Sequence, residues 1–208
     1  LGDTERVVHE IVALEFLTGR GVATNEAPVV VLTGDTPLLT GESLVAMLMK
    51  HVESAATATV LTADLDSPFG YGRVLRSSDR VVGIVEEKDA TPQQREISEI
   101  NSGMYAFDGA ALLDAITGLN TNNSQGEEYL TDVIEILASR GDVVIGVGAH
   151  NTSDILGIND RSQLAAAMAI MRDRINDKWM KAGVTIFDPE STWIDVDAEL
   201  APDLTLFP

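Results

Sequence analysis

Several residues of types that bind ligands follow short apolar runs in this chain of 208 residues. The run VVVLT at 29–33 predicts a buried strand that delivers Thr33, Gly34 and Asp35 at its carboxyl end, where open α/β sheets bind ligands. A glycine lets a ligand approach the backbone closely, and a carboxylate can hold a divalent cation. The alternative is that Asp35 only stabilises the turn into the next helix.

Four more residues offer contacts to a ligand: Gly72, Glu86, Asn101 and Asn159. A glycine bend can accommodate a flat base or a sugar, and a carboxylate can accept hydrogen bonds from sugar hydroxyls. An asparagine amide both donates and accepts hydrogen bonds. Each residue also has a structural interpretation. Gly72 can belong to an ordinary hairpin and Glu86 can be a solvated charge, while Asn101 can form an Asn-Ser-Gly turn and Asn159 can cap a helix.

The chain has no pattern for covalent catalysis or for a metal site made of histidine or cysteine. It contains no cysteine, and its three histidines have neither metal-ligand spacing nor a paired partner. The motif G-x-S-x-G and the phosphate-binding motifs G-x-G-x-x-G and G-x-x-x-x-G-K do not occur. The sequence therefore gives no indication of a covalent nucleophile.

Acidic residues dominate the charge of the chain. It has 33 Asp and Glu against 14 Lys and Arg, a formal net charge of −19, which argues against nucleic acid or an anionic membrane surface as a partner. Apolar residues make up 45% of the chain, but no apolar run approaches the roughly 20 residues of a membrane-spanning helix. The amino terminus does not resemble a signal peptide, so we expect a cytoplasmic protein.

Apolar runs rich in β-branched residues alternate with helical patterns, which is typical of an α/β fold with a mostly parallel mixed sheet. Strands are expected at 29–33, 58–63, 81–85, 104–107, 143–147 and 184–187. Three helices are expected around 44–48, at 112–119 with Asp108 as N-cap, and at 130–137 before Gly141. The longest helix is expected from Asp160 to Ala182, opening with a capping box.

The pattern of the sequence changes after Gly183. Ile194, Leu200 and Leu206 recur at a six-residue period, which is typical of β-helical coils whose turns stack on one another, although three positions can also recur by chance. If the period marks such a coil, we expect the chain to be a fragment that ends as a second domain begins.

Five segments, in this order along the chain, resemble one family: LTGDTPLL, DSPFGYGRVLR, GIVEEKDATPQQREISEINSGMYAF, NNSQGEEYLTDVIEILA and GINDRSQLA. This family is the bacterial bifunctional enzyme N-acetylglucosamine-1-phosphate uridylyltransferase/glucosamine-1-phosphate acetyltransferase. The similarity extends over residues 27–208. It implies a Rossmann-like nucleotidyltransferase domain at 1–159, a linker helix at 160–182 and the first partial coil of a left-handed β-helix at 183–208.

The resemblance implies a magnesium-dependent reaction between two anions. UTP and N-acetylglucosamine 1-phosphate would give pyrophosphate and UDP-N-acetylglucosamine, which is used to make peptidoglycan. Asp35 and Asn159 match the family's magnesium ligands, and Thr33 and Gly34 match the stretch that contacts the nucleotide. The residues implied for the sugar pocket are Gly72, Glu86, Asn101, Tyr129 and Thr131.

The chain also departs from the family's pattern. The glycine-rich loop that opens the family's domain is not found, and the segment ERVVHEI at 5–11 is only loosely similar to the Pro-Lys-Val-Leu-His that follows it, with Arg6 in the place of the lysine. The acetyltransferase, which uses acetyl-CoA, and the homotrimer are expected only in the full-length parent, and this piece is expected to be monomeric. Two alternatives are a non-catalytic sugar-nucleotide-binding module and a nucleotidyltransferase for another sugar. The segments KDATPQQR and GEEYLTD argue against the second alternative.

Overall fold

The computed structural model describes residues 28–119, 121 and 123–207, so the expected match of residues 5–11 lies outside it. These residues form two compact units. Of the described residues, unit 1 contains those up to Gly34 together with those of Leu39–Ile155, and unit 2 contains Asp35–Leu38 and those from Leu156 onward. The two expected magnesium ligands therefore belong to unit 2, and the expected sugar-binding residues belong to unit 1.

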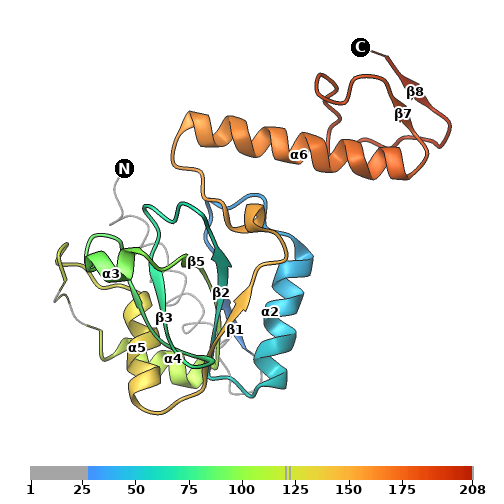
Figure 1. The fold of residues 1–208 in the computed structure, drawn as a ribbon. Coiled ribbons are helices and arrows are strands. Elements are labelled where there is room, and N and C mark those ends of the chain that lie inside the picture. The colour runs from blue at the N-terminus through green and yellow to red at the C-terminus, as the bar shows by residue number, and fades with distance from the viewer. Residues whose placement is uncertain (1–27, 120, 122, 208) are drawn as a thin grey trace. The chain divides into compact units, whose positions relative to one another are not determined.

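Unit 1 is built on a six-stranded sheet (Figure 1). Its strands are β1 (Val29–Val31), β2 (Ala58–Asp64), β3 (Arg73–Ser77), β4 (Arg80–Val85), β5 (Glu99–Phe107) and β6 (Val144–Gly148). The strand order is β4-β3-β5-β2-β6, and β1 also pairs with β5. Because β2 pairs with β5 from end to end, β1 and β3 share the other edge of β5.

The sheet is mixed, as predicted, but its pairings are mainly antiparallel where a mostly parallel sheet was expected. Among the described strands, β2 and β6 form the one parallel pair of this sheet, and the other four pairings are antiparallel. The apolar pattern missed β3, since two of its five residues are arginines. A two-residue turn, in which Ser78 has a φ of +55°, returns the chain from β3 to β4, and such a hairpin is antiparallel by necessity.

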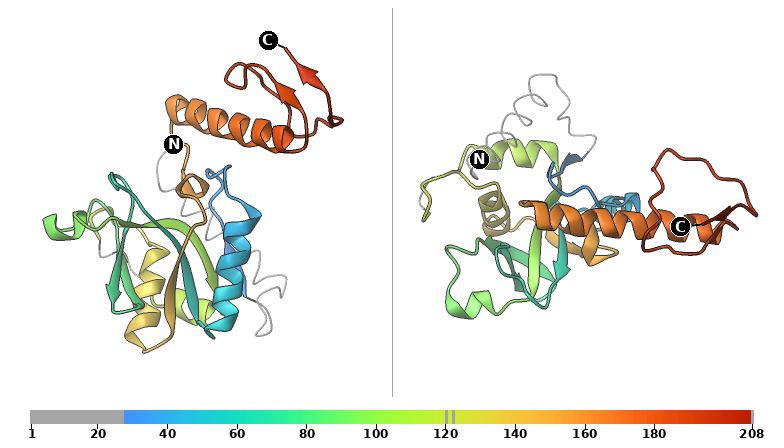
Figure 2. Two further views of the ribbon diagram at one scale, coloured as in Figure 1. Left: turned by 45° about the vertical axis from the view of Figure 1, so that its right-hand side comes forward. Right: turned by 90° about the horizontal axis from the view of Figure 1, so that it is seen from above.

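Helices cover both faces of the sheet of unit 1, and Figure 2 shows this arrangement from two further sides. Helix α2 (Gly41–Glu53) covers one face, and α4 (Gly109–Ile116) and α5 (Thr131–Ser139) cover the other. The short helices α3 (Pro92–Arg95) and η1 (Thr152–Ile155) lie in connections. The expected N-cap is confirmed, because the Asp108 carboxylate accepts a hydrogen bond from Ala111 N–H (2.8 Å), and so is the left-handed Gly141 after α5, with a φ of +87°. α4 ends at Ile116, three residues before the expected end at 119.

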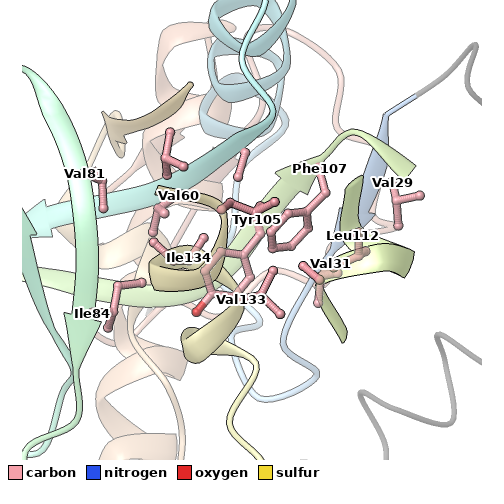
Figure 3. Packing of buried hydrophobic residues seen from close by; sticks show 14 of the residues in the cluster. Val29, Val31, Val60, Val81, Ile84, Tyr105, Phe107, Leu112, Val133 and Ile134 are labelled. Atoms are coloured by element: carbon pink, nitrogen blue, oxygen red, sulfur yellow. The ribbon is translucent and has the colours of Figure 1, made fainter. Parts of the chain in front are cut away.

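The central strand β5 contributes side chains to the core on both faces of the sheet. Tyr105 and Phe107 belong to the apolar cluster under α4 and α5 (Figure 3), and Met104 and Ala106 belong to the cluster under α2. This division follows from the alternation of side chains along a strand. The four side chains are at most 2% exposed, so β5 is a rigid base for the residues at its amino end.

Unit 2 consists of the long helix α6 (Arg161–Lys181), the strands β7 (Thr185–Ile186) and β8 (Thr205–Leu206), and the Asp35–Leu38 segment. The predicted capping box is confirmed, since Asp160 Oδ1 accepts Gln163 N–H (2.7 Å) and Gln163 Oε1 accepts the Asp160 N–H (3.2 Å). β7 and β8 pair in parallel. One parallel pair of two-residue strands does not establish a repeating coil, so the β-helical coil stays a prediction.

His51 gives unit 1 a measurable pH dependence of stability. The imidazole is 6% exposed, and its Nδ1 lies 2.9 Å from Thr59 Oγ1. Burial lowers the pKa of His51, and the negative charge of Asp108 opposes this shift. The folded chain binds this proton less readily than the unfolded chain, so stability is lost as the pH falls below about 6.5, and the free energy of unfolding should fall by at most about 1 kcal/mol at pH 5.5.

Urea denaturation at pH 7.5 and pH 5.5 measures this loss. His51→Gln removes the titrating group, so the variant should lose less stability between the two pH values than the parent does. An equal loss in both proteins would mean that groups other than His51 produce the pH dependence.

Candidate active site

Three of the expected sugar-binding residues meet at one place in unit 1. The Gly72 carbonyl accepts a hydrogen bond from the Asn101 N–H at 2.8 Å, which joins the start of β3 to β5. A Cβ atom on Gly72 would lie 3.1 Å from Ile84 Cγ2 and 3.3 Å from Glu86 Oε1. Gly72 therefore leaves the space beside the half-buried Glu86 carboxylate open, and any larger residue there would press against that carboxylate.

Asn101 lies inside a strand, not in front of one as the sequence predicted. β5 begins at Glu99, and its register against β2 shifts between Val60 and Thr62. Within this irregular stretch Asn101 Oδ1 accepts the N–H of Gly103 at 3.0 Å, and Gly103 has a φ of +77° that favours glycine. The Asn-Ser-Gly sequence thus forms a bulge in β5, and the bulge sets the orientation of the Asn101 amide.

A second loop, residues 123–129, is tied to the segment that follows Glu86. Asn123 Oδ1 accepts the N–H groups of residues 125, 126 and 127 at 2.8–3.2 Å, so this one amide organises the loop. Gln125 receives a hydrogen bond from Lys88 Nζ and donates one to the Tyr129 hydroxyl, each at 2.6 Å. The basic residue after Glu86 is therefore linked to Tyr129 through a single side chain.

Tyr129 and Thr131 are both buried at the amino end of α5. Burial raises the pKa of the Tyr129 hydroxyl, and the charges of Asp89 and Glu86 raise it further, so this hydroxyl stays protonated at neutral pH. Among the described residues, Thr131 Oγ1 is buried without a hydrogen-bond partner. An unpaired buried polar atom costs about 1–3 kcal/mol, which a ligand that hydrogen-bonds this hydroxyl would recover.

An ion pair between a buried arginine and a partly buried glutamate, which the sequence analysis missed, lies beside these residues. Arg73 follows Gly72, is 2% exposed, and places its Nη2 2.7 Å from Oε2 of Glu87, the residue after Glu86. Arg73 also donates a hydrogen bond to the carbonyl of Tyr71. An arginine directly before the apolar pair Val74 and Leu75, with two glutamates after the next strand, was the available signal in the sequence. The pair fixes the backbone on both sides of the Gly72–Glu86 contact.

Asp35 and Asn159, which are 124 positions apart, lie side by side in unit 2. The Asp35 carbonyl accepts the N–H of Ile158 at 2.9 Å. A Cβ atom on Gly157 would lie 3.4 Å from Asp35 Oδ2 and 3.8 Å from Asn159 Nδ2. The carboxylate and the amide therefore share one small space, which exists because residue 157 has no side chain.

The chemistry of this pair fits a magnesium ion. Carboxylate and amide oxygens are the hard donors that magnesium prefers, and magnesium usually keeps several water molecules and substrate oxygens as its other ligands. In the part of the chain that the structure describes, no group of three or more His, Cys, Asp or Glu residues could hold a metal ion. Asp35 and Asn159 thus offer few protein ligands, and magnesium can be bound by few protein ligands.

Thr33 and Gly34, expected to contact the nucleotide, lie in the turn between β1 and Asp35. Thr33 is half-buried, and Gly34 is exposed with no atom within 4 Å of the position that a Cβ would take. The backbone at Gly34 can therefore be approached closely by a ligand.

No described helix is long and apolar enough to cross a membrane.

The chain is an α/β nucleotidyltransferase. Residues 11–196 match the family model described as nucleotidyl transferase, and the chain belongs to this family. A solved structure of a putative glucose-1-phosphate thymidylyltransferase from Bacillus anthracis in complex with a sucrose has the same fold. It matches with a TM-score of 0.57 and 21% identity over 78% of this chain and 60% of that chain.

Curated relatives identify the branch of the family. The chain is 48% identical over 177 residues to the bifunctional protein GlmU of Syntrophotalea carbinolica (85% of this chain, 38% of the relative). It is 50% identical over 184 residues to that of Geobacillus thermodenitrificans (88% and 40%) and 45% identical over 205 residues to that of Streptococcus gordonii (98% and 43%). The predicted resemblance and enzyme class are confirmed. The chain spans about two fifths of the length of these relatives.

Proposed function

We propose that the chain provides the uridylyltransferase part of a bifunctional enzyme, which joins UTP and N-acetylglucosamine 1-phosphate to give UDP-N-acetylglucosamine and pyrophosphate. The observation that supports it most directly is the meeting of the Asp35 carboxylate and the Asn159 amide beside Gly157. The two residues are remote in sequence, and the family resemblance assigns both to magnesium.

The reaction is a substitution at phosphorus. A phosphate oxygen of N-acetylglucosamine 1-phosphate forms a bond to the α-phosphorus of UTP, and the bond from that phosphorus to the bridging oxygen of pyrophosphate breaks. Both reactants are anions, so the main barrier is to bring like charges together in line. Asp35 and Asn159 would hold the Mg²⁺ ion, which when bound neutralises phosphate charge.

The other residues of the site would bind and orient the sugar. Glu86 offers a carboxylate that accepts hydrogen bonds from sugar hydroxyls, and the absence of a side chain at Gly72 leaves room beside it. The unpaired hydroxyl of Thr131 and the protonated hydroxyl of Tyr129 offer further hydrogen bonds. Asn101, fixed by the bulge in β5, completes the proposed sugar pocket.

The relatives are longer and are named bifunctional, which supports a second activity in the rest of the protein. We infer that this activity is acetyl transfer from acetyl-CoA to glucosamine 1-phosphate in a β-helical domain that starts at about residue 183. In this proposal residues 1–159 form the uridylyltransferase domain, 160–182 form the linker helix, and the β-helix assembles a homotrimer in the cytoplasm.

Calorimetric titration of this chain with UDP-N-acetylglucosamine, with and without Mg²⁺, tests the proposed function. We expect binding, and tighter binding when Mg²⁺ is present. Binding that does not respond to Mg²⁺ would favour a non-catalytic sugar-nucleotide module. Tighter binding of a different nucleotide sugar in the same titration would identify another sugar as the substrate.

Glu86→Ala is expected to weaken the binding of UDP-N-acetylglucosamine by about 1–3 kcal/mol, because hydrogen bonds to a charged acceptor are lost. The same calorimetric titration measures this change. Glu53→Ala, which removes an exposed carboxylate at the end of α2, is the control and should leave the affinity unchanged. If the two variants bind equally well, Glu86 is a surface charge and not a sugar ligand.

A further inference from the structure

Asp154 is a fully buried carboxylate (0% exposed) in η1 of unit 1. Its Oδ2 accepts hydrogen bonds from Thr40 Oγ1 at 2.5 Å and from Ser43 Oγ at 2.6 Å. Both distances are in the range of short hydrogen bonds between a hydroxyl and a charged oxygen. The two hydroxyls belong to the N-cap and the first turn of α2, so the positive end of the helix dipole faces the carboxylate.

These contacts join two segments that are more than 100 residues apart in sequence. A third contact comes from the same segment as Asp154, because the His150 N–H donates to Ser43 Oγ at 2.8 Å. Ser43 is completely buried, so its hydroxyl serves both contacts without competition from water. The segment that leads into α2 and the segment that leads into α6 are thus held together within unit 1.

The proposed metal ligands lie on these same two segments. Asp35 precedes Thr40 by five residues, and Asn159 follows Asp154 by five residues. Beyond the Asp154 contacts the segments meet again in unit 2, where the Asp35 carbonyl accepts the N–H of Ile158. Each ligand therefore stands on a short stretch whose start is set by the Asp154 contacts.

We propose that Asp154 is a positioning residue for the magnesium pair, and this inference rests on the proposed function. In this role the carboxylate acts through the backbone of the two segments and is not itself a metal ligand. It sets the register between the 35–40 and 154–159 segments, and with it the separation of the Asp35 carboxylate and the Asn159 amide. Hydrogen-bond partners that orient metal ligands commonly change metal affinity by about 10–100-fold when they are removed.

Asp154→Asn in the full-length protein is the main test. Asparagine keeps the size of the side chain but replaces the charged acceptor by a neutral one. We expect the Mg²⁺ concentration for half-maximal activity to rise about tenfold, at the lower end of that range because Asp154 acts through the backbone. The KM for N-acetylglucosamine 1-phosphate should stay the same. Titration of the protein and UDP-N-acetylglucosamine with Mn²⁺, followed by electron paramagnetic resonance, should show the same loss of metal affinity without turnover.

Ser43→Ala removes one donor and keeps the carboxylate, so it tests the same contact if Asp154→Asn does not fold. We expect a smaller shift in the same direction. Thr59→Val is the control for a general loss of stability. It breaks the buried contact with His51 in the last turn of α2, whereas Asp154 contacts the first turn. It should lower stability and leave the Mg²⁺ requirement unchanged.

The outcomes separate this inference from the proposed function. If Asp35→Ala lowers Mn²⁺ affinity while Asp154→Asn and Ser43→Ala only lower stability, the metal pair stands and the positioning role is wrong. If Asp35→Ala also leaves Mn²⁺ affinity unchanged, the metal pair itself is wrong. A rise in the Mg²⁺ requirement that Thr59→Val reproduces would assign the effect to stability and overturn the inference.

Discussion

Replacing Asp35 by alanine is expected to lower magnesium-dependent pyrophosphate release by the full-length protein about 10³-fold. The change leaves the neutral Asn159 amide as the remaining protein ligand in the proposed pair, and a neutral amide is a weak ligand for a hard cation. A bound metal stabilises the transition state by several kcal/mol, and each 1.36 kcal/mol is a factor of ten in rate. A pyrophosphate-release assay over a series of Mg²⁺ concentrations measures the loss.

Two control variants make this result specific. Asp35→Asn keeps the shape of the side chain without its charge, and it should show most of the loss if the carboxylate binds the metal. Asp79→Ala removes an exposed carboxylate in the turn between β3 and β4 and should not change turnover. Near-normal turnover in Asp35→Ala would refute the metal assignment.

The second large effect is expected at the buried ion pair beside Gly72. Arg73→Met should lower the free energy of unfolding by about 3 kcal/mol, because it leaves the Glu87 carboxylate without its buried partner. Arg95, whose Nε lies 3.6 Å from Glu87 Oε1, keeps the loss at the lower end of the range for such pairs. Urea denaturation measures the change, and UDP-N-acetylglucosamine should bind more weakly to the variant.

Arg140→Met is the matched control. It breaks an ion pair with Asp114 of similar length (2.6 Å), but those two side chains are 42% and 72% exposed, so the expected loss is about 0–1 kcal/mol. The double variant Arg73→Met, Glu87→Met should recover much of the lost stability, since no unpaired, partly buried charge remains. Equal losses in Arg73→Met and Arg140→Met would contradict the role given to burial.

Local patterns predicted most of the elements of this fold. The strands at 58–63 and 81–85 were found within a residue of their ends, and the capping box at Asp160 was found as well. These features depend on the alternation of apolar residues and on side chains close in sequence, which is why the sequence displays them. β3 was not predicted, because Arg73 is a polar residue in the pattern and its burial depends on the distant partner Glu87.

The sequence by itself determined the family, the approximate positions of the four longest helices and the identity of the residues proposed to bind sugar and metal. Only the tertiary structure decided which of them meet: that Asp35 and Asn159 share the space beside Gly157, that Asn101 lies in a bulge paired to Gly72, and that the sheet is mainly antiparallel. Motifs and helix caps are local, whereas strand direction and the approach of distant segments depend on hydrogen bonds between residues tens to more than a hundred positions apart. Buried groups such as Asp154, which looks like an ordinary surface acid in the sequence, acquire their role only through those distant partners.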